Sequence, residues 1–191
     1  FNEKQAIEHS SQIGFPLAMK VLSNQILHKT ETGGVELNIK NLEELKSSFK
    51  KLSDVFKKLK INIENQKFLI QKMEKGISEI ILGYRIDELV GPIVVIGSGG
   101  ILSEIYNDKS IRMAPVDISE AKKMIKEVKS LVTITGYRGL PEADINIIAT
   151  AIVNISKFAF IKEIKEAEIN PVIVKKEKEG IVAVDGLITL N

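Results

Sequence analysis

Residues 20–35 read Lys20-Val21-Leu22-Ser23-Asn24-Gln25-Ile26-Leu27-His28-Lys29-Thr30-Glu31-Thr32-Gly33-Gly34-Val35. Lys20 stands near the end of the apolar run 17–22, and His28 stands in the polar segment that follows. Paired glycines close this segment, and residues 35–39 then alternate like a returning strand. Backbone N–H groups near glycines can approach anionic oxygens closely, and lysine supplies a positive charge. The stretch therefore predicts strand, loop and strand, in a form suited to handling phosphate.

His28 is one of only two histidines, the other being His9, and the chain contains no cysteine. If the protein uses a covalent nucleophile, His28 is the leading candidate. The absence of cysteine excludes disulfides, cysteine-ligated zinc and thiol chemistry. It also fits a reducing compartment, so we expect a cytoplasmic protein.

Composition narrows the class of protein further. The 191 residues are 44% hydrophobic and 27% charged, which is typical of a globular chain with one domain or two compact lobes. A net charge of +2 is too even to suggest nucleic acid as the default partner. The most apolar windows are too short for a membrane span or are interrupted by polar residues. Because the chain begins with Phe1 rather than methionine, we expect it to be part of a longer protein.

Hydrophobic periodicity and breaker residues predict alternating helices and strands. The expected helices cover residues 2–13, 41–59, 117–129 and 141–161, the last with a proline in its first turn. The expected strands cover residues 17–22, 35–39, 68–73, 78–85, 93–96, 102–106, 169–174 and 181–184. This order predicts an α+β fold with an antiparallel sheet, divided into lobes of residues 1–70 and 71–191.

Oxygen-bearing side chains follow one another near the end of the chain. Residues two apart on a strand face the same side, so Glu168 and Asn170 can converge. A hairpin that returns through Gly180 can bring Asp185 beside them. Carboxylate and amide oxygens suit an Mg²⁺ ion whose coordination shell is completed by phosphate oxygens. The plainer interpretation is the end of a strand with polar capping groups.

Other candidates have plainer alternatives as well. Lys20 can reach a nucleotide phosphate or be an edge lysine in water. The cluster Gly97-Ser98-Gly99-Gly100 can cradle phosphate or form a turn, and it matches neither the Walker nor the dinucleotide pattern. Arg112 and Arg138 stand in expected loops, where each is either an anion ligand or a surface residue.

Taken in order, these segments resemble the ATP-grasp domain of NDP-forming acyl-CoA synthetases, in the succinyl-CoA synthetase superfamily. The likeness is closest to the β subunit of acetate–CoA ligase (ADP-forming). It covers nearly the whole chain through motifs in shared order: Ile13–Lys20, Ile26–Lys29, Gly33–Val35, Ile70–Met73, Glu79 with Gly83, Asp87 with Gly91-Pro92, Gly97–Glu104, Arg112–Pro115, Gly136–Gly139, Glu168–Pro171 and Asp185.

The resemblance implies two α/β lobes with the nucleotide between them, and an acid–thiol ligase. Acyl-CoA, ADP and phosphate would interconvert with a carboxylate, CoA and ATP, with Mg²⁺ as cofactor. The implied site has His28 as phosphoryl carrier, Glu168 orienting a phosphohistidine, and Asn170 and Asp185 holding Mg²⁺. The implied nucleotide-binding residues are Lys20, Gln71, Lys72, Met73, Glu79 and, with less support, Arg112.

The same resemblance implies a partner and leaves alternatives open. The family's domain normally begins before the helix at Asn2, so the first lobe is expected to be incomplete at its N-terminus. Nothing here resembles the CoA-binding portion, so a CoA-binding α subunit or fused domain, and a hetero-oligomer, are expected. The alternatives are a regulatory ATP-grasp module, such as one fused to an acetyltransferase, a ligase that forms an acyl phosphate directly, and an unspecified α+β binding domain. His28 favours the active enzyme over the first two.

Overall fold

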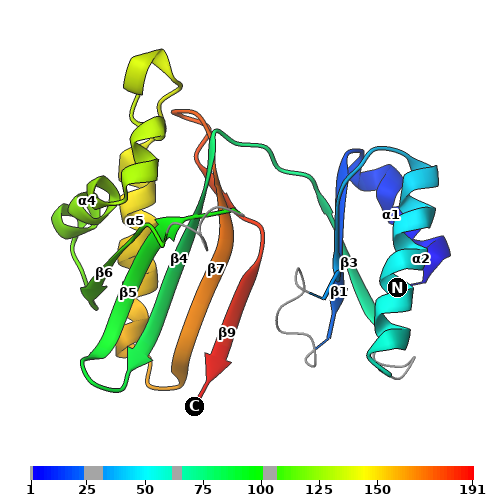
Figure 1. Cartoon of the computed structure of the whole chain (residues 1–191), viewed down its shortest axis with the longest axis horizontal. Coiled ribbons are helices and arrows are strands. Elements are labelled where there is room, and N and C mark those ends of the chain that lie inside the picture. The colour runs from blue at the N-terminus through cyan, green and yellow to red at the C-terminus, as the bar shows by residue number, and fades with distance from the viewer. Residues whose placement is uncertain (1, 24–31, 62–65, 101–106) are drawn as a thin grey trace. The chain divides into compact units, whose positions relative to one another are not determined.

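The computed structural model describes residues 2–23, 32–61, 66–100 and 107–191, which form two compact units, Phe1–Met73 and Glu74–Asn191 (Figure 1). The expected lobe boundary, between residues 70 and 71, lies inside a strand of the first unit. That strand is paired along its full length with a neighbour, so the division falls after it. Among the described helices, none has the length and apolar character needed to cross a bilayer.

The first unit is a three-stranded antiparallel sheet with two helices. Its elements are α1 (Glu3–Ile13), β1 (Leu17–Leu22), β2 (Val35–Ile39), α2 (Leu42–Lys58) and β3 (Lys67–Lys72), and the strand order is β2-β1-β3. Leu17, Met19 and Val21 alternate along β1 and are fully buried with residues of α2. Phe56 of α2 meets Phe68 of β3 edge to face, with ring centroids 5.3 Å apart.

Both helices of this unit begin where the sequence predicts. The Asn2 side chain accepts a hydrogen bond from the backbone N–H of Gln5, and the Gln5 side chain accepts one from the N–H of Asn2. At α2, the Asn41 side chain accepts from the N–H of Glu44 at 2.9 Å. These bonds satisfy N–H groups that a helix leaves unpaired in its first turn.

The second unit is a larger antiparallel sheet covered on one face by helices. Its strands are β4 (Ser78–Asp87), β5 (Gly91–Ser98), β6 (Lys109–Met113), β7 (Ile164–Val174), β8 (Ile181–Ala183) and β9 (Gly186–Leu190). The strand order is β6-β5-β4-β7-β8, and β9 also pairs with β7. The helices are α4 (Ile118–Glu127) and α5 (Ile145–Ser156), with the short 3₁₀ turns η2 (Lys129–Ile134), η3 (Tyr137–Gly139) and η4 (Lys157–Phe160).

The two faces of this larger sheet differ in character. Ile80, Leu82 and Tyr84 of β4 are buried in a core shared with α4 and α5. The residues between them point the other way, as strand alternation requires. We call that side the outer face; on the two central strands it carries Glu79, Ile81, Gly83, Val95 and Gly97.

The structure corrects several sequence-based boundaries. Residues 109–113 were expected to be a loop but form β6, and residues 186–190 form β9, which was not expected. The last long helix begins at Ile145 rather than at Pro141, because the Asp144 carboxylate accepts N–H bonds from Asn146 and Ile147. The expected strand at 102–106 lies outside the described residues.

Hydrogen bonds and an ion pair fix the chain on either side of the boundary between the units. The N–H of Met73 donates to the carbonyl of Pro16, within the first unit. In the second unit, the Glu74 carboxylate lies 2.7 Å from the Lys175 ammonium, and the N–H of Ile77 donates to the carbonyl of Val174. Each flank is therefore anchored to its own unit.

Candidate functional site

In the first unit, β1 and β3 place a lysine and a glutamine on the same face of the sheet. Lys20 pairs with Leu69, and Gln71 pairs with Ala18, so the two polar side chains are diagonal neighbours. Lys20 is 6% exposed, which is unusual for lysine, so the plainer interpretation of an edge lysine in water is wrong. The Gln71 Oε1 atom is buried and has no hydrogen-bond partner in the described structure.

The residues that follow Gln71 run to the end of the first unit. Lys72 is exposed at the end of β3, and Met73 is half-buried directly after it. The backbone N–H of Met73 is already used by Pro16. The structure thus keeps Lys20, Gln71, Lys72 and Met73 in the same small sheet or directly beside it.

In the second unit, three predicted residues come together at β7. Asn170 Nδ2 donates to Glu168 Oε1 at 3.2 Å, and the backbone N–H of Asn170 donates to the carbonyl of Asp185 at 3.1 Å. Asp185 immediately precedes β9, whose Gly186 pairs with Ile169. Because Glu168 pairs with Gly83, its side chain lies on the outer face.

This cluster has the chemistry of a small hard-cation site. Asn170 uses its amide nitrogen toward Glu168, and within the described structure no group donates to its amide oxygen. Glu168 and Asn170 are exposed, and Asp185 is half-buried. The described residues contain no group of three His, Cys, Asp or Glu that could hold a metal unaided. A cation here would need oxygens from another source, as Mg²⁺ in phosphate-binding sites does.

Glu79 also lies on the outer face, beside the glycine-rich segment. The N–H of Gly99 donates to the carbonyl of Glu79 at 2.7 Å. A Cβ atom at position 99 would lie 2.8–2.9 Å from the Glu79 backbone, so glycine is required for this close contact. At Gly99 the glycine cluster therefore has a packing role. Gly97 and Ser98 belong to β5, and Gly100 follows with φ of 79°.

Arg112 is not brought together with the other predicted residues. It pairs with Val94, a core residue, so its side chain lies on the helix-covered face. Its Nε atom donates to Glu120 Oε1 at 2.7 Å, and Nη2 donates to Glu127 Oε1. These bonds raise the pKa of Arg112 and lower the pKa of both carboxyls. The expectation that it stands in a loop was wrong, and its hydrogen bonds give it a structural role.

The remaining candidates are His28 and Arg138. His28 lies outside the described residues. Arg138 is exposed in η3 with φ of 53°, and its guanidinium lies 5.2 Å from the centroid of the Tyr137 ring. Within the described structure, no hydrogen bond or ion pair joins Arg138 to Glu168, Asn170 or Asp185.

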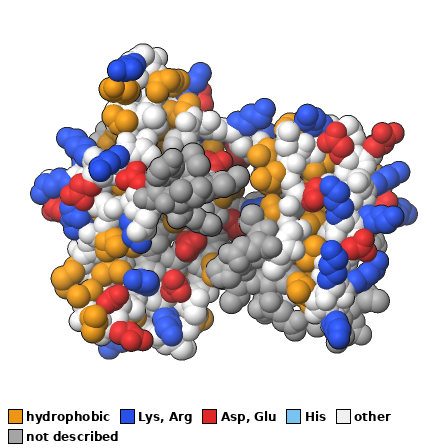
Figure 2. All heavy atoms as spheres, in the orientation of Figure 1, with side chains coloured by type: hydrophobic (Ala, Val, Ile, Leu, Met, Phe, Trp, Pro, Cys, Tyr) orange, Lys and Arg blue, Asp and Glu red, His pale blue; other side chains and the backbone are white. Residues whose placement is uncertain are grey.

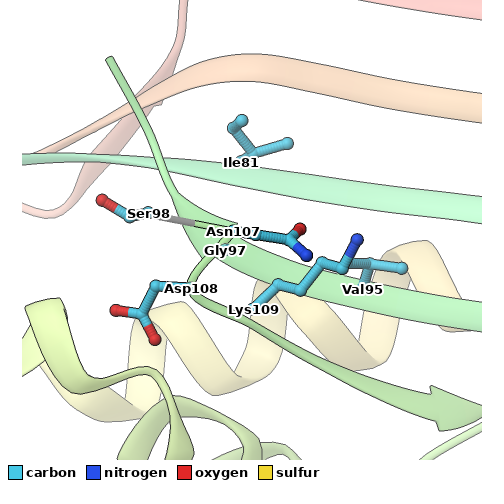
Figure 3. Close-up of a pocket in the computed structure, with 7 residues that line it drawn as sticks. All are labelled: Ile81, Val95, Gly97, Ser98, Asn107, Asp108 and Lys109. Atoms are coloured by element: carbon cyan, nitrogen blue, oxygen red, sulfur yellow. The ribbon is translucent and has the colours of Figure 1, made fainter. Parts of the chain in front are cut away.

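Two polar residues of the outer face escaped the sequence analysis. Asn107 and Lys109 line a pocket on β5 and β6 (Figure 3). No motif marks them, and Lys109 is one of many lysines in the chain. The signal that could have identified them is the alternation Lys109, Ile111, Met113 along a strand paired with β5, which sequence analysis missed because it assigned this segment to a loop.

The model of the ATP-grasp domain family matches residues 2–190. The chain belongs to the ATP-grasp family. This ATP-grasp chain is 36% identical over 190 residues to the β subunit of acetate–CoA ligase (ADP-forming) I from Pyrococcus furiosus, and the match covers 99% of the chain and 81% of that relative. It is also 36% identical over 190 residues to the 4-hydroxybutyrate–CoA ligase (ADP-forming) of Nitrosopumilus maritimus, again over 99% of the chain.

The ATP-grasp chain spans only 27% of the Nitrosopumilus relative, whereas it spans most of the Pyrococcus subunit. Among solved structures, it resembles the dinucleotide-forming acetyl-coenzyme A synthetase 1 of Ca. Korarchaeum cryptofilum in complex with coenzyme A and Mg-AMPPCP. That structure has its phosphohistidine segment pointing towards the nucleotide-binding site. The TM-score is 0.79 at 32% identity, covering 100% of this chain and 83% of the other. The resemblance to ATP-grasp acyl-CoA synthetases is thereby confirmed at the level of family and fold.

Proposed function

We propose that the chain is the nucleotide-binding part of an ADP-forming acyl-CoA synthetase of the acetyl-CoA type. In the overall reaction, acyl-CoA, ADP and phosphate give a carboxylate, CoA and ATP. The chain's own step passes a phosphoryl group between a phosphohistidine and ADP. The observation that carries this proposal is the convergence of Glu168, Asn170 and Asp185 on one side of β7.

The donor set at this cluster fits Mg²⁺. The Asn170 amide oxygen and the Asp185 carboxylate are hard oxygen ligands, one on β7 and the other on the residue before β9, which pairs with β7. Two protein ligands are too few for a closed metal site, but they suit an ion that shares its coordination with phosphate oxygens and water. When bound, Mg²⁺ would neutralise charge on the phosphates. A relative solved with Mg-AMPPCP supports Mg²⁺ as the cation of the proposed reaction.

The first unit supplies the complementary polar groups in this proposal. Lys20, whose side chain is nearly buried on β1, is proposed to hold a nucleotide phosphate, as the likeness to ATP-grasp synthetases implies. Gln71 Oε1 has no donor in the described structure, and an exocyclic amino group on a base would supply one. Lys72 at the end of β3 and Met73 directly after it are proposed to lie beside the nucleotide base. Glu79, exposed on β4, is proposed to lie near the nucleotide.

His28 is the proposed phosphoryl carrier, on sequence grounds. Attack by an imidazole nitrogen on the γ-phosphorus of ATP forms a P–N bond, breaks the P–O bond to ADP and releases ADP. The reverse step regenerates ATP, since a phosphoramidate is energetic enough to phosphorylate ADP. Glu168 would accept the other imidazole N–H and so orient a phosphohistidine. Protein groups contribute mainly positioning and charge neutralisation, as in phosphoryl transfer generally.

A CoA-binding partner is part of the proposal. One relative is named a β subunit, and another is a chain of which this sequence matches about a quarter. Both arrangements supply further protein beside the ATP-grasp part. We therefore propose that a CoA-binding α subunit or fused domain completes the enzyme and brings the first phosphohistidine.

The proposal is tested by phosphorylating the chain with radiolabelled Mg-ATP in the presence of its CoA-binding partner. We expect acid-labile, base-stable label that is lost in His28→Ala. His9→Ala, which removes the other histidine from exposed α1, is the matched control and should keep the label. Label that survives in His28→Ala would refute the role of His28. Binding of Mg-ATP without any labelling would favour a regulatory ATP-grasp module instead.

A further inference from the structure

The outer face of the larger sheet carries a pocket away from the Glu168–Asp185 cluster. Its volume is about 180 Å³, and it is lined by Ile81, Val95, Gly97, Ser98, Asn107, Asp108 and Lys109. Ile81 and Val95 give it an apolar floor on β4 and β5, and the polar residues form its rim (Figure 3). The pocket is smaller and more open than a site that encloses a small molecule, but it combines an apolar floor with a few polar groups, as ligand sites do.

The charges on the rim are not equivalent. Asp108 turns away from the pocket, and its carboxylate accepts hydrogen bonds from the N–H groups of Lys129 and Ser130 at 3.0 and 2.7 Å. Lys109 makes no hydrogen bond or ion pair within the described structure. Asn107, with φ of 48°, places its amide beside the Lys109 side chain (Figure 3). The pocket therefore presents one uncompensated positive charge and an amide, a combination that favours an anion.

The register connects this pocket with the proposed magnesium ligands. Lys109 pairs with Gly97, Gly97 pairs with Ile81, and Ile81 lies opposite the irregularity of β7 that contains Asn170. These residues form one row across the outer face, three strand spacings or about 14 Å long. Gly97 has no side chain to obstruct the middle of the row. A lysine side chain reaching inward and a chain of phosphates can occupy that distance together.

We propose that Lys109, assisted by Asn107, binds the phosphate chain of the nucleotide from the side opposite the Mg²⁺ ligands. This inference rests on the proposed function, because it takes the nucleoside di- or triphosphate as the ligand of the outer face. Lys109, on β6, adds a second cation to the site beside Mg²⁺. None of the residues that the sequence predicts to bind phosphate lies on the outer face of β6. Phosphate oxygens are held between Asn170 and Asp185 on one side and Lys109 on the other.

The test measures the affinity of the full chain for Mg-ADP over a series of salt concentrations. Lys109→Met should weaken binding about tenfold, the effect of losing one charge-assisted hydrogen bond. The affinity of the variant should also fall less steeply with salt than that of the wild type, because one ionic contact is missing. Lys109→Arg should recover most of the affinity, since it keeps the charge.

Lys126→Met is the matched control: it removes the same charge from an exposed position in the last turn of α4, on the helix-covered side of the sheet. It should bind Mg-ADP as the wild type does. Unchanged binding in Lys109→Met, or weakening that neither alters the salt dependence nor is recovered by arginine, would overturn the inference alone. A wild-type chain that does not bind Mg-ADP would overturn the proposed function, and the inference with it.

Discussion

Single residues of the outer face show where steric limits are strict. Gly99 lies against the backbone of Glu79, and any side chain at position 99 would clash with it. Gly83 lies on the adjacent part of β4, where an added Cβ would meet its nearest neighbours at 3.8 and 3.9 Å, an ordinary contact distance. These two glycines therefore differ sharply in their tolerance of substitution.

We predict that Gly99→Ala lowers the free energy of unfolding by about 1–3 kcal/mol, as overpacking generally does. Gly83→Ala is the control and should be neutral or slightly stabilising, because alanine restricts the unfolded chain more than glycine does. Urea denaturation of the two variants measures the difference. Equal effects of both substitutions would show that the contact between Gly99 and Glu79 is not restrictive.

At this scale the sequence predicted the convergence of Glu168, Asn170 and Asp185, because strand alternation and one hairpin determine it. It did not show that Arg112, implied as a nucleotide-binding residue, lies on the helix-covered face. The register of a strand decides whether a side chain faces the ligand or the helices. Because the segment that forms β6 was expected to be a loop, its register on β5 could not be predicted. The same error concealed Lys109.

Among the elements, β6 and α4 are joined by a polar clamp. Arg112 of β6 bonds to Glu120 and Glu127 of α4, and Ser110 Oγ donates to Glu127 at 2.6 Å. Hydrogen bonds from Arg112 lower the pKa of both carboxyls below the ordinary value of 4.5. A lowered pKa means that the clamp stabilises the fold above pH 4.5 and is lost as the pH falls through the lowered values.

Arg112→Met should therefore lower the melting temperature by a few degrees at neutral pH and leave Mg-ADP affinity unchanged. The difference in stability between variant and wild type should shrink as the pH falls from 4.5 through the lowered pKa values, below which the carboxylates are protonated in both proteins. Thermal melts across this pH range provide the measurement. A loss of nucleotide affinity in the folded variant would restore Arg112 to the binding site.

Most elements could be predicted because their periodicity and caps agree. Asn2 and Asn41 begin helices as expected, and the strands around Lys20 are found where the apolar runs place them. Beyond Met113 the signals conflict. Pro141 is a good first-turn residue for a helix, but Asp144 provides the hydrogen bonds that start α5. The local sequence alone does not show whether the helix starts at Pro141 or after Asp144.

The molecule as a whole has two separate hydrophobic cores. One includes Leu52 and Phe56 of α2, and the other includes Ile148 and Ile152 of α5. No buried residue belongs to both cores within the described chain. The two-lobe organisation expected from the element order therefore has a physical basis, since each sheet buries its own apolar face.

Leu52→Ala should destabilise the first unit by about 2–5 kcal/mol, through lost burial and the cavity left behind. Because the cores are separate, amide exchange should accelerate in α1, α2 and β1–β3 and stay unchanged in β4–β9. Leu42→Ala, at a position 45% exposed on the same helix, is the control and should have little effect. Faster exchange throughout the chain would show that the units unfold together.

The chain around Met73 and Glu74 is anchored separately in each unit. Met73 is tied by its N–H to Pro16, and the Glu74 side chain is tied to Lys175. The two anchors share no residue, so a substitution that removes one of them leaves the bond of the other in place.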